Sequence, residues 1–68
     1  MKIAYDKKTD SLYIHLSDSP SEQSEEVSDD IIMDYDKFGH PVGIDIQNAS
    51  THADIDEITI SNIPSKAA

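Results

Sequence analysis

Three aspartates are the residues of this chain that are best placed to do chemistry. Asp34 and Asp36 stand two positions apart, so they share one face of an extended strand, and Asp45 follows after a short turn. Carboxylates held close together can bind a divalent cation, which relieves their mutual repulsion. Their spacing does not match an EF-hand loop, which requires acidic ligands at alternate positions and a glutamate at the twelfth. The favoured interpretation is a solvated polar face with Asp36 bonding the backbone of the turn, and a metal site is the alternative.

The histidines and serines form no catalytic pattern. His15, His40 and His52 are expected on a strand exterior, in a turn and in a loop, and no two have the spacing that places them on one helix face. None of the serines sits in a G-x-S-x-G elbow. The chain has no cysteine, which removes a thiolate nucleophile, a disulfide framework and a cysteine zinc site. We therefore predict no catalytic residue, no cofactor and no enzymatic activity. The competing hypothesis is a small metal-dependent hydrolase or metal-binding protein that uses the three aspartates.

The length and charge of the chain restrict its partners. Its 68 residues include 14 acidic and 5 basic ones, which makes one small domain with a formal net charge of −9. All the basic residues are lysines, and they supply no basic patch for nucleic acid or for an anionic membrane. No apolar run approaches the ~20 residues that a membrane span needs, and no signal-peptide pattern opens the chain. These features predict a soluble, cytoplasmic protein that binds neither nucleic acid nor membrane.

Alternating apolar and polar residues predict short strands, and helical spacing is weak throughout. We expect strands at residues 2–5, 11–17, 25–36, 41–47 and 55–63. Short connections make sequential neighbours antiparallel, because a parallel crossover needs a dozen or more residues. The predicted fold is α+β and mostly β: an antiparallel meander of four to five strands, with at most one short helical segment near residues 48–54 that Asn48 or Ser50 would cap.

The sharpest local signal is the turn at residues 36–40. A short loop with Gly39 near its end suits a type I turn followed by a left-handed residue, and glycine takes a positive φ without steric cost. Asp36, Gly39 and Gly43 are predicted to be structural residues of this turn region. Within 25–36, the Ser-Asp-Asp run at 28–30 interrupts the apolar pattern and predicts a bulge or a bend in that strand.

A single domain is predicted over residues 1–64, followed by a flexible C-terminal tail at 65–68. One face of its sheet is expected to be apolar and to carry Ile3, Tyr5, Leu12, Ile14, Leu16, Ile31, Met33, Tyr35, Val42, Ile44, Ile46, Ile58 and Ile60. The short helical segment cannot cover such a face, which exceeds the few hundred Å² of apolar surface that soluble monomers tolerate. We therefore expect a homo-oligomer, most simply a symmetric dimer.

Tyr13 and His15 stand on the opposite, polar face of the strand at 11–17. An aromatic pair on a polar face is typical of a contact surface. Ordinary cross-strand packing explains the pair equally well. Tyr13 and His15 are therefore candidate interface residues, with both interpretations open.

Several motifs of the chain are similar to those of one known family. The first half contains Tyr5-Asp6, then Thr9-Asp10-Ser11-Leu12-Tyr13-Ile14, then Glu25-Glu26-Val27. The second half contains Ile32-Met33-Asp34-Tyr35-Asp36, Gly39, Val42-Gly43-Ile44-Asp45-Ile46 and Asn48-Ala49-Ser50. Together they resemble the YuzE-like family of small prokaryotic proteins, the domain of unknown function 2283, over roughly residues 2 to 50. The chain departs from the family pattern at His15 and at Thr51-His52, where basic residues are common in the family.

The resemblance implies a small, sheet-rich α+β domain and no established enzymatic activity. Some members of the family are thought to be encoded in two-component operons of the toxin–antitoxin type. A chain as acidic as this one would suit a basic protein partner in such a pair. A DNA-binding antitoxin is the third hypothesis, and the absence of arginine argues against it.

Overall fold

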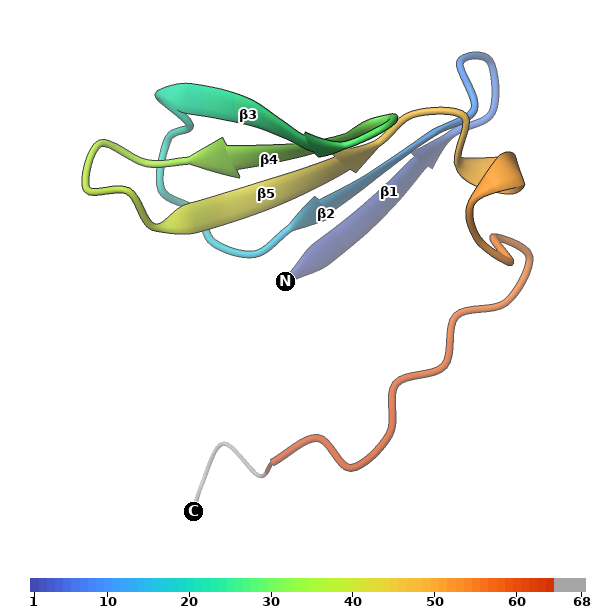
Figure 1. The fold of residues 1–68 in the computed structure, drawn as a ribbon. Coiled ribbons are helices and arrows are strands. Elements are labelled where there is room, and N and C mark those ends of the chain that lie inside the picture. Colours follow the sequence, from blue (N-terminus) through green and yellow to red (C-terminus); the bar gives the residue numbers. More distant parts are fainter. Residues whose placement is uncertain (65–68) are drawn as a thin grey trace.

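The folded part of the molecule is one antiparallel sheet of five strands (Figure 1). The computed structural model describes residues 1–64. The strands are β1 (Lys2–Asp6), β2 (Ser11–His15), β3 (Gln23–Ser28), β4 (Ile31–Tyr35) and β5 (Pro41–Ile46), and a single turn of 3-10 helix, η1 (Ala49–Thr51), follows them. The predicted fold class, an antiparallel and mostly β sheet with one short helical segment near residues 48–54, is confirmed.

The strand order shows that the sheet consists of two hairpins joined by the last strand. The order is β1-β2-β5-β4-β3, so β5 lies in the middle and pairs with both β2 and β4. The expected order, a meander in which each strand pairs with the next, is therefore wrong between β2 and β3. The connection at residues 16–22 is long enough to separate the β1–β2 hairpin from the β3–β4 hairpin by the width of one strand. β5 then occupies the position between the two hairpins.

The segment predicted as one strand at 25–36 is in fact two strands. β3 and β4 form a hairpin with Ser28 opposite Ile31, and Asp29 and Asp30 make the turn. Asp30 adopts a φ of 65°, a left-handed conformation that aspartate tolerates better than most residues. The expected irregularity is present, since the register shifts between Glu26 and Ser28. The interruption at 28–30 thus reverses the chain instead of only bending it.

The last predicted strand, at residues 55–63, does not form. Beyond η1 the described chain has no regular structure, and it runs away from the sheet as an extended segment (Figure 1). In the described chain β5 already lies between two neighbours, and the segment pairs with neither free edge of the sheet, β1 or β3. The predicted flexible tail at 65–68 lies outside the described residues.

The register of the strands places the apolar residues on one face, as the alternation predicts. Ile14 lies opposite both Ile3 and Ile44, and Met33 lies opposite Ile44 on the other side. Among the described residues no large side chain is fully buried. Val42 is only 3% exposed, but every residue of β4 is half-buried, and Ile3 at the sheet edge is 37% exposed. The sheet is thus a single layer whose apolar face is incompletely covered.

The turn between β4 and β5 has the predicted geometry. Gly39 has a φ of 82°, and its N–H donates to the carbonyl oxygen of Asp36 at 3.0 Å. A Cβ atom at Gly39 would meet no heavy atom within 4 Å, so backbone conformation alone restricts this position. Positive φ is costly for residues with a Cβ atom and most costly for β-branched ones.

Replacing Gly39 with valine should destabilise the fold by about 1 kcal/mol or more, through the strain of a β-branched residue at positive φ. Thermal unfolding followed by circular dichroism measures the change. Gly39→Asn is the matched control, because asparagine tolerates the left-handed conformation and should unfold close to the parent. Equal melting temperatures for the valine and asparagine variants would show that φ is not what restricts this position.

Candidate functional site

Asp34 accepts hydrogen bonds from two side chains on the polar face of the sheet. The hydroxyl of Tyr13 donates to one carboxylate oxygen of Asp34 at 2.6 Å, and the hydroxyl of Ser24 donates to the other at 2.6 Å. Because Ser24 lies on β3, Asp34 on β4 and Tyr13 on β2, these bonds bridge across the sheet. Both oxygens of the Asp34 carboxylate therefore accept hydrogen bonds that connect the strands of the sheet.

Gly43 lies inside β5 and not in a turn, which corrects its predicted role. It sits between Tyr13 and Asp34, and a Cβ atom there would collide with the phenol ring of Tyr13. The ring of Tyr13 thus crosses the central strand at the one residue without a side chain, and its hydroxyl reaches Asp34 beyond it. The hydrogen bond to Asp34, then burial, then the negative charges of Asp34 and Asp45 raise the pKa of Tyr13 to about 12.

Asp36 is a turn residue, as the favoured interpretation predicts. It is buried, and one of its carboxylate oxygens accepts the N–H groups of Phe38 and His40, both at 2.9 Å. The ring of His40 approaches the other oxygen at 3.5 Å. The backbone bond from His40, followed by that from Phe38, lowers the pKa of Asp36 despite burial. This carboxylate closes the β4–β5 loop.

The three aspartates do not assemble into a metal site. Asp45 is half-buried on β5, opposite Tyr13 on one side and Ile32 on the other, while Asp36 turns away into its own loop. Within residues 1–64, no three acidic or histidine side chains come close enough together to hold a metal ion. The carboxylate-based metal hypothesis therefore has no support in the geometry.

Tyr13 and His15 do lie together on the polar face. Their rings meet edge to face, with centroids 4.5 Å apart and planes at 70°. Tyr13 is half-buried by its contacts with Gly43 and Asp34, whereas His15 is exposed. Cross-strand packing accounts for Tyr13, and a contact surface at Tyr13 and His15 stays a prediction.

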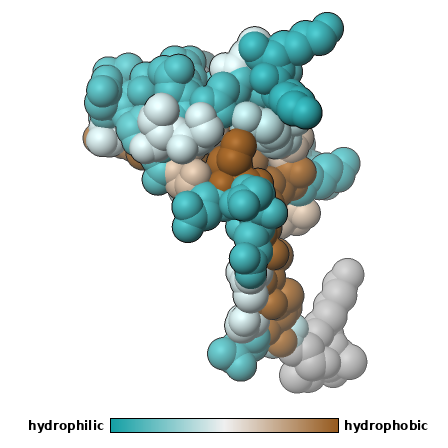
Figure 2. Space-filling model, turned by 90° about the vertical axis from the view of Figure 1, so that its right-hand side faces the viewer, coloured by the Kyte–Doolittle hydropathy of each residue, from teal (hydrophilic) through white to brown (hydrophobic). Residues whose placement is uncertain are grey.

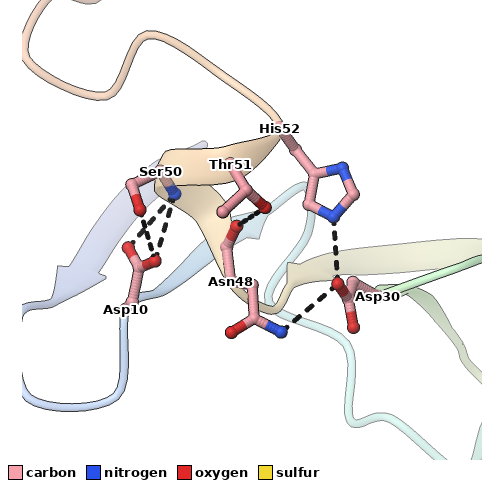
Figure 3. A network of polar contacts seen from close by, with 6 residues as sticks. All are labelled: Asp10, Asp30, Asn48, Ser50, Thr51 and His52. Carbon is pink, nitrogen blue, oxygen red and sulfur yellow. Dashed lines mark hydrogen bonds and ion pairs between the residues drawn. The ribbon is translucent and has the colours of Figure 1, made fainter.

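A second polar network fastens η1 to the hairpin turns at one end of the sheet (Figure 3). Asp10, in the turn after β1, accepts the hydroxyl of Ser50 at 2.6 Å and the N–H of Ser50 at 3.1 Å. Asp30, in the β3–β4 turn, accepts the amide of Asn48 at 3.3 Å and lies 3.0 Å from Nε2 of His52. The short segment after β5 thus clamps both hairpins.

The clamp uses main-chain bonds and side-chain charge together. Gln47 donates its N–H to the carbonyl of Asp30, and Ala49 donates to that of Asp10, both at 2.8 Å. The bond from Ser50 lowers the pKa of Asp10, with Tyr5 contributing next, and the bond from His52 lowers the pKa of Asp30, with Asn48 next. Both carboxylates are therefore held as acceptors in their charged form.

This network places serine, histidine and aspartate near one another without making a catalytic triad. In a triad the serine hydroxyl donates to the imidazole, and the imidazole is oriented by the aspartate. Here the hydroxyl of Ser50 donates to Asp10, and His52 contacts Asp30 instead. The two aspartates serve as separate anchors, and the imidazole of His52 is bonded to Asp30 and not to Ser50.

Sequence reasoning did not single out Asp10, Asp30 or Asn48 as network residues. The three share a left-handed backbone, with φ values of 53°, 65° and 50°. The available signal was an Asp or Asn placed where a strand-like run begins or ends, since such residues are enriched at positive φ. Their partners could not be inferred, because Asp10 and Ser50 are 40 positions apart.

A groove of about 320 Å³ lies beside the β4–β5 turn, open to solvent. It is lined by Ser19, Pro20, Glu22, Asp36, Lys37 and Phe38. The ring of Phe38 is exposed, and the ammonium of Lys37 lies 5.2 Å from its centroid. One oxygen of Asp36 is already used by the two N–H groups of the turn.

The fold and these two networks define a small β-sheet protein whose polar side chains fasten turns and strands. The sequence profile described as "Protein of unknown function (DUF2283)" matches residues 2–50, which include every strand and the start of η1. The chain belongs to this family, as its motifs led us to expect.

One curated relative is an uncharacterized protein of the archaeon Methanocaldococcus jannaschii. It is 37% identical over 57 residues, which cover 84% of this chain and 48% of the relative. The chain thus spans about half the length of the curated relative it matches. No solved structure matches the chain. Within residues 1–64, no helix has the length and apolarity needed to cross a membrane.

Replacing Gly43 with alanine should destabilise the fold by about 1–3 kcal/mol, because the added Cβ collides with the ring of Tyr13. A double-mutant cycle by chemical denaturation checks the cause. In a Tyr13→Ser background, the same Gly43→Ala change should cost much less, since the ring is gone. An equal cost in both backgrounds would mean that the contact with Tyr13 is not the reason for this glycine.

Acid should destabilise the protein by protonating Asp10, Asp30 and Asp36. Each has a lower pKa in the folded chain than in the unfolded one, where it is near 4. The stability they contribute is therefore complete above about pH 4 and is lost as the pH falls through their folded-state values. Thermal unfolding between about pH 7 and pH 2 measures this.

Asp36→Asn provides the test, because its amide oxygen accepts the same turn bonds but does not titrate in this range. Its melting temperature should fall less steeply with acid than that of the parent. Asp18→Asn, in the loop after β2, makes the same change of charge and should keep the parental slope. If the melting temperature of the Asp36→Asn variant falls with acid as steeply as that of the parent, protonation of Asp36 does not contribute to the loss of stability.

Proposed function

We propose that this protein is a non-enzymatic interaction module that functions as a homo-oligomer, with a second copy covering the apolar face of the sheet. The observation that carries the proposal is the single-layer architecture. A face built from Ile14, Met33 and Ile44 has no second layer above it in the described chain. An apolar face without a covering layer is typical of protein–protein contacts.

The free-energy balance favours association. Burial of about 400 Å² of apolar surface per chain contributes roughly 10 kcal/mol before the cost of association. The opposing term is repulsion between two chains of net charge −9. That repulsion is spread over the surface and screened beyond about 8 Å at physiological salt. Added salt should therefore tighten the oligomer.

Light scattering over a range of protein concentrations tests the proposal, with Ile3→Asp as the variant. Ile3 faces the apolar side at the edge strand, so a charge there should weaken association about tenfold or more. Ala4→Asp is the matched control: it adds the same charge to the neighbouring residue, which faces the polar side opposite Tyr13.

The parent should show a mass well above 7.5 kDa at high concentration, and the Ala4 variant should follow it closely. A mass of 7.5 kDa at every protein and salt concentration would overturn self-association. If Ile3→Asp and Ala4→Asp weaken self-association equally, the added charge alone explains the effect and the apolar face is not the contact surface.

A second candidate function is that of the acidic member of a pair with a basic, toxin-like protein. The observation that favours it is β3, an edge strand whose residues are all exposed and include Glu25 and Glu26. An edge strand with free backbone groups and negative side chains suits a basic chain better than a neutral one.

Co-expression with the products of adjacent genes tests this candidate. A specific partner should carry net positive charge, and its affinity should fall with salt. Glu25→Gln together with Glu26→Gln should weaken the complex. Asp56→Gln with Glu57→Gln, which removes the same charge beyond η1, is the control. A partner that binds both double variants as tightly as the parent would argue against β3 as the surface.

A further inference from the structure

The segment after η1 carries a second exposed apolar surface. In this C-terminal segment, residues 54–64, the side chains of Ile58, Ile60 and Ile63 are 56%, 60% and 67% exposed. Figure 2 shows the hydrophobic surface on the lower side of the sheet and a line of hydrophobic residues along the segment that descends from it. One chain thus exposes both an apolar sheet face and an apolar extended segment.

The pattern of the segment matches an extended chain that contacts such a face. In extended backbone, successive side chains alternate between two sides. Ile58 and Ile60 then share one side, and the polar residues Glu57, Thr59 and Ser61 share the other. One row of isoleucines can contact an apolar face while the polar row stays in water.

Charge distinguishes the two edges of the sheet. The segment begins with three acidic residues, Asp54, Asp56 and Glu57. The β1 edge and its turn carry Lys2, Lys7 and Lys8, which are three of the five lysines of the chain and outnumber the two aspartates there, Asp6 and Asp10. The β3 edge carries Glu22, Glu25 and Glu26 at and beside the strand. Electrostatic complementarity therefore directs the segment to the β1 side.

We propose that the C-terminal segment of one chain covers the β1 side of the apolar face of a second copy, and that the exchange is reciprocal. Ile58 and Ile60 then lie against Ile3 and Tyr5, the residues of β1 on the apolar face. This inference rests on the proposed self-association and names the part of the second copy that does the covering.

The occupant is a second copy and not the same chain, because the segment leaves the end of its own sheet and runs away from it (Figure 1). Exchange of an identical element between two copies needs no new fold and follows two-fold symmetry. It buries the apolar segment and the β1 side of the apolar face of both chains at once. The acidic β3 edge stays unoccupied in the pair.

The first experiment measures the dissociation constant of the dimer by light scattering and sedimentation. Ile58→Asp with Ile60→Asp should raise it about 100-fold or more, as expected when two buried isoleucines are replaced by charges. Thr59→Asp with Ser61→Asp adds the same charge on the polar side of the segment and should change it by less than about threefold.

The outcomes separate the two proposals. A parental dissociation constant in the Ile58 and Ile60 variant overturns the role of the segment and leaves self-association in place. A parent that stays at 7.5 kDa overturns both. A monomeric parent that is destabilised by the Ile58 and Ile60 changes shows that the segment covers its own sheet, which also overturns the exchange.

The second experiment locates the segment. Because the chain has no cysteine, an Ile3→Cys chain mixed with an Ile60→Cys chain can form a mixed disulfide only between copies. We expect this mixed dimer to form faster than the one between Glu25→Cys and Ile60→Cys chains. Glu25 shares the apolar face with Met33 but lies at the opposite edge. Faster linkage to position 25 overturns the placement at β1.

Discussion

A single layer of five short strands has one apolar face, and the described chain supplies no second layer to cover it. This constraint governs the rest of the molecule. A protein of this size buries only about 60% of the surface that its unfolded chain exposes, so its core is thin under the best conditions. Here the best-covered apolar side chains, Leu12, Val42 and Ala49, are small or medium in size. Strand pairing and polar anchors therefore carry a large part of the stability of the described chain.

The polar anchors compensate where apolar burial is weak. Asp10 and Asp30 tie the segment after β5 to the two hairpin turns, and Asp36 closes the turn at the other end of β5. Each of these carboxylates accepts more than one hydrogen bond. An acidic composition is thus used in part for structure, since a charged oxygen is a stronger acceptor than a neutral one.

Local patterns predicted the faces of the strands and the Gly39 turn, because alternation and positive φ are properties of neighbouring residues. They did not predict the hairpin at Asp29 and Asp30, because aspartate marks a turn less clearly than glycine does. They also did not predict the central position of β5, which depends on pairing with β2, about thirty residues earlier. The contact of Tyr13 with Asp34 across Gly43 follows from that register, so no local signal could have indicated it.

The same strand order has a kinetic consequence. The β1–β2 and β3–β4 hairpins are local and can form within about 1–10 μs, but an isolated hairpin is marginally stable. β5 follows β4 after a short turn, so β3, β4 and β5 can also pair locally, whereas the ladder between β2 and β5 joins strands far apart in the sequence. The folding rate should therefore follow the closure of the loop between β2 and β5, which brings the β1–β2 hairpin to the other three strands. Gly43, the residue over which the Tyr13 ring closes, lies on the strand that makes this long-range ladder.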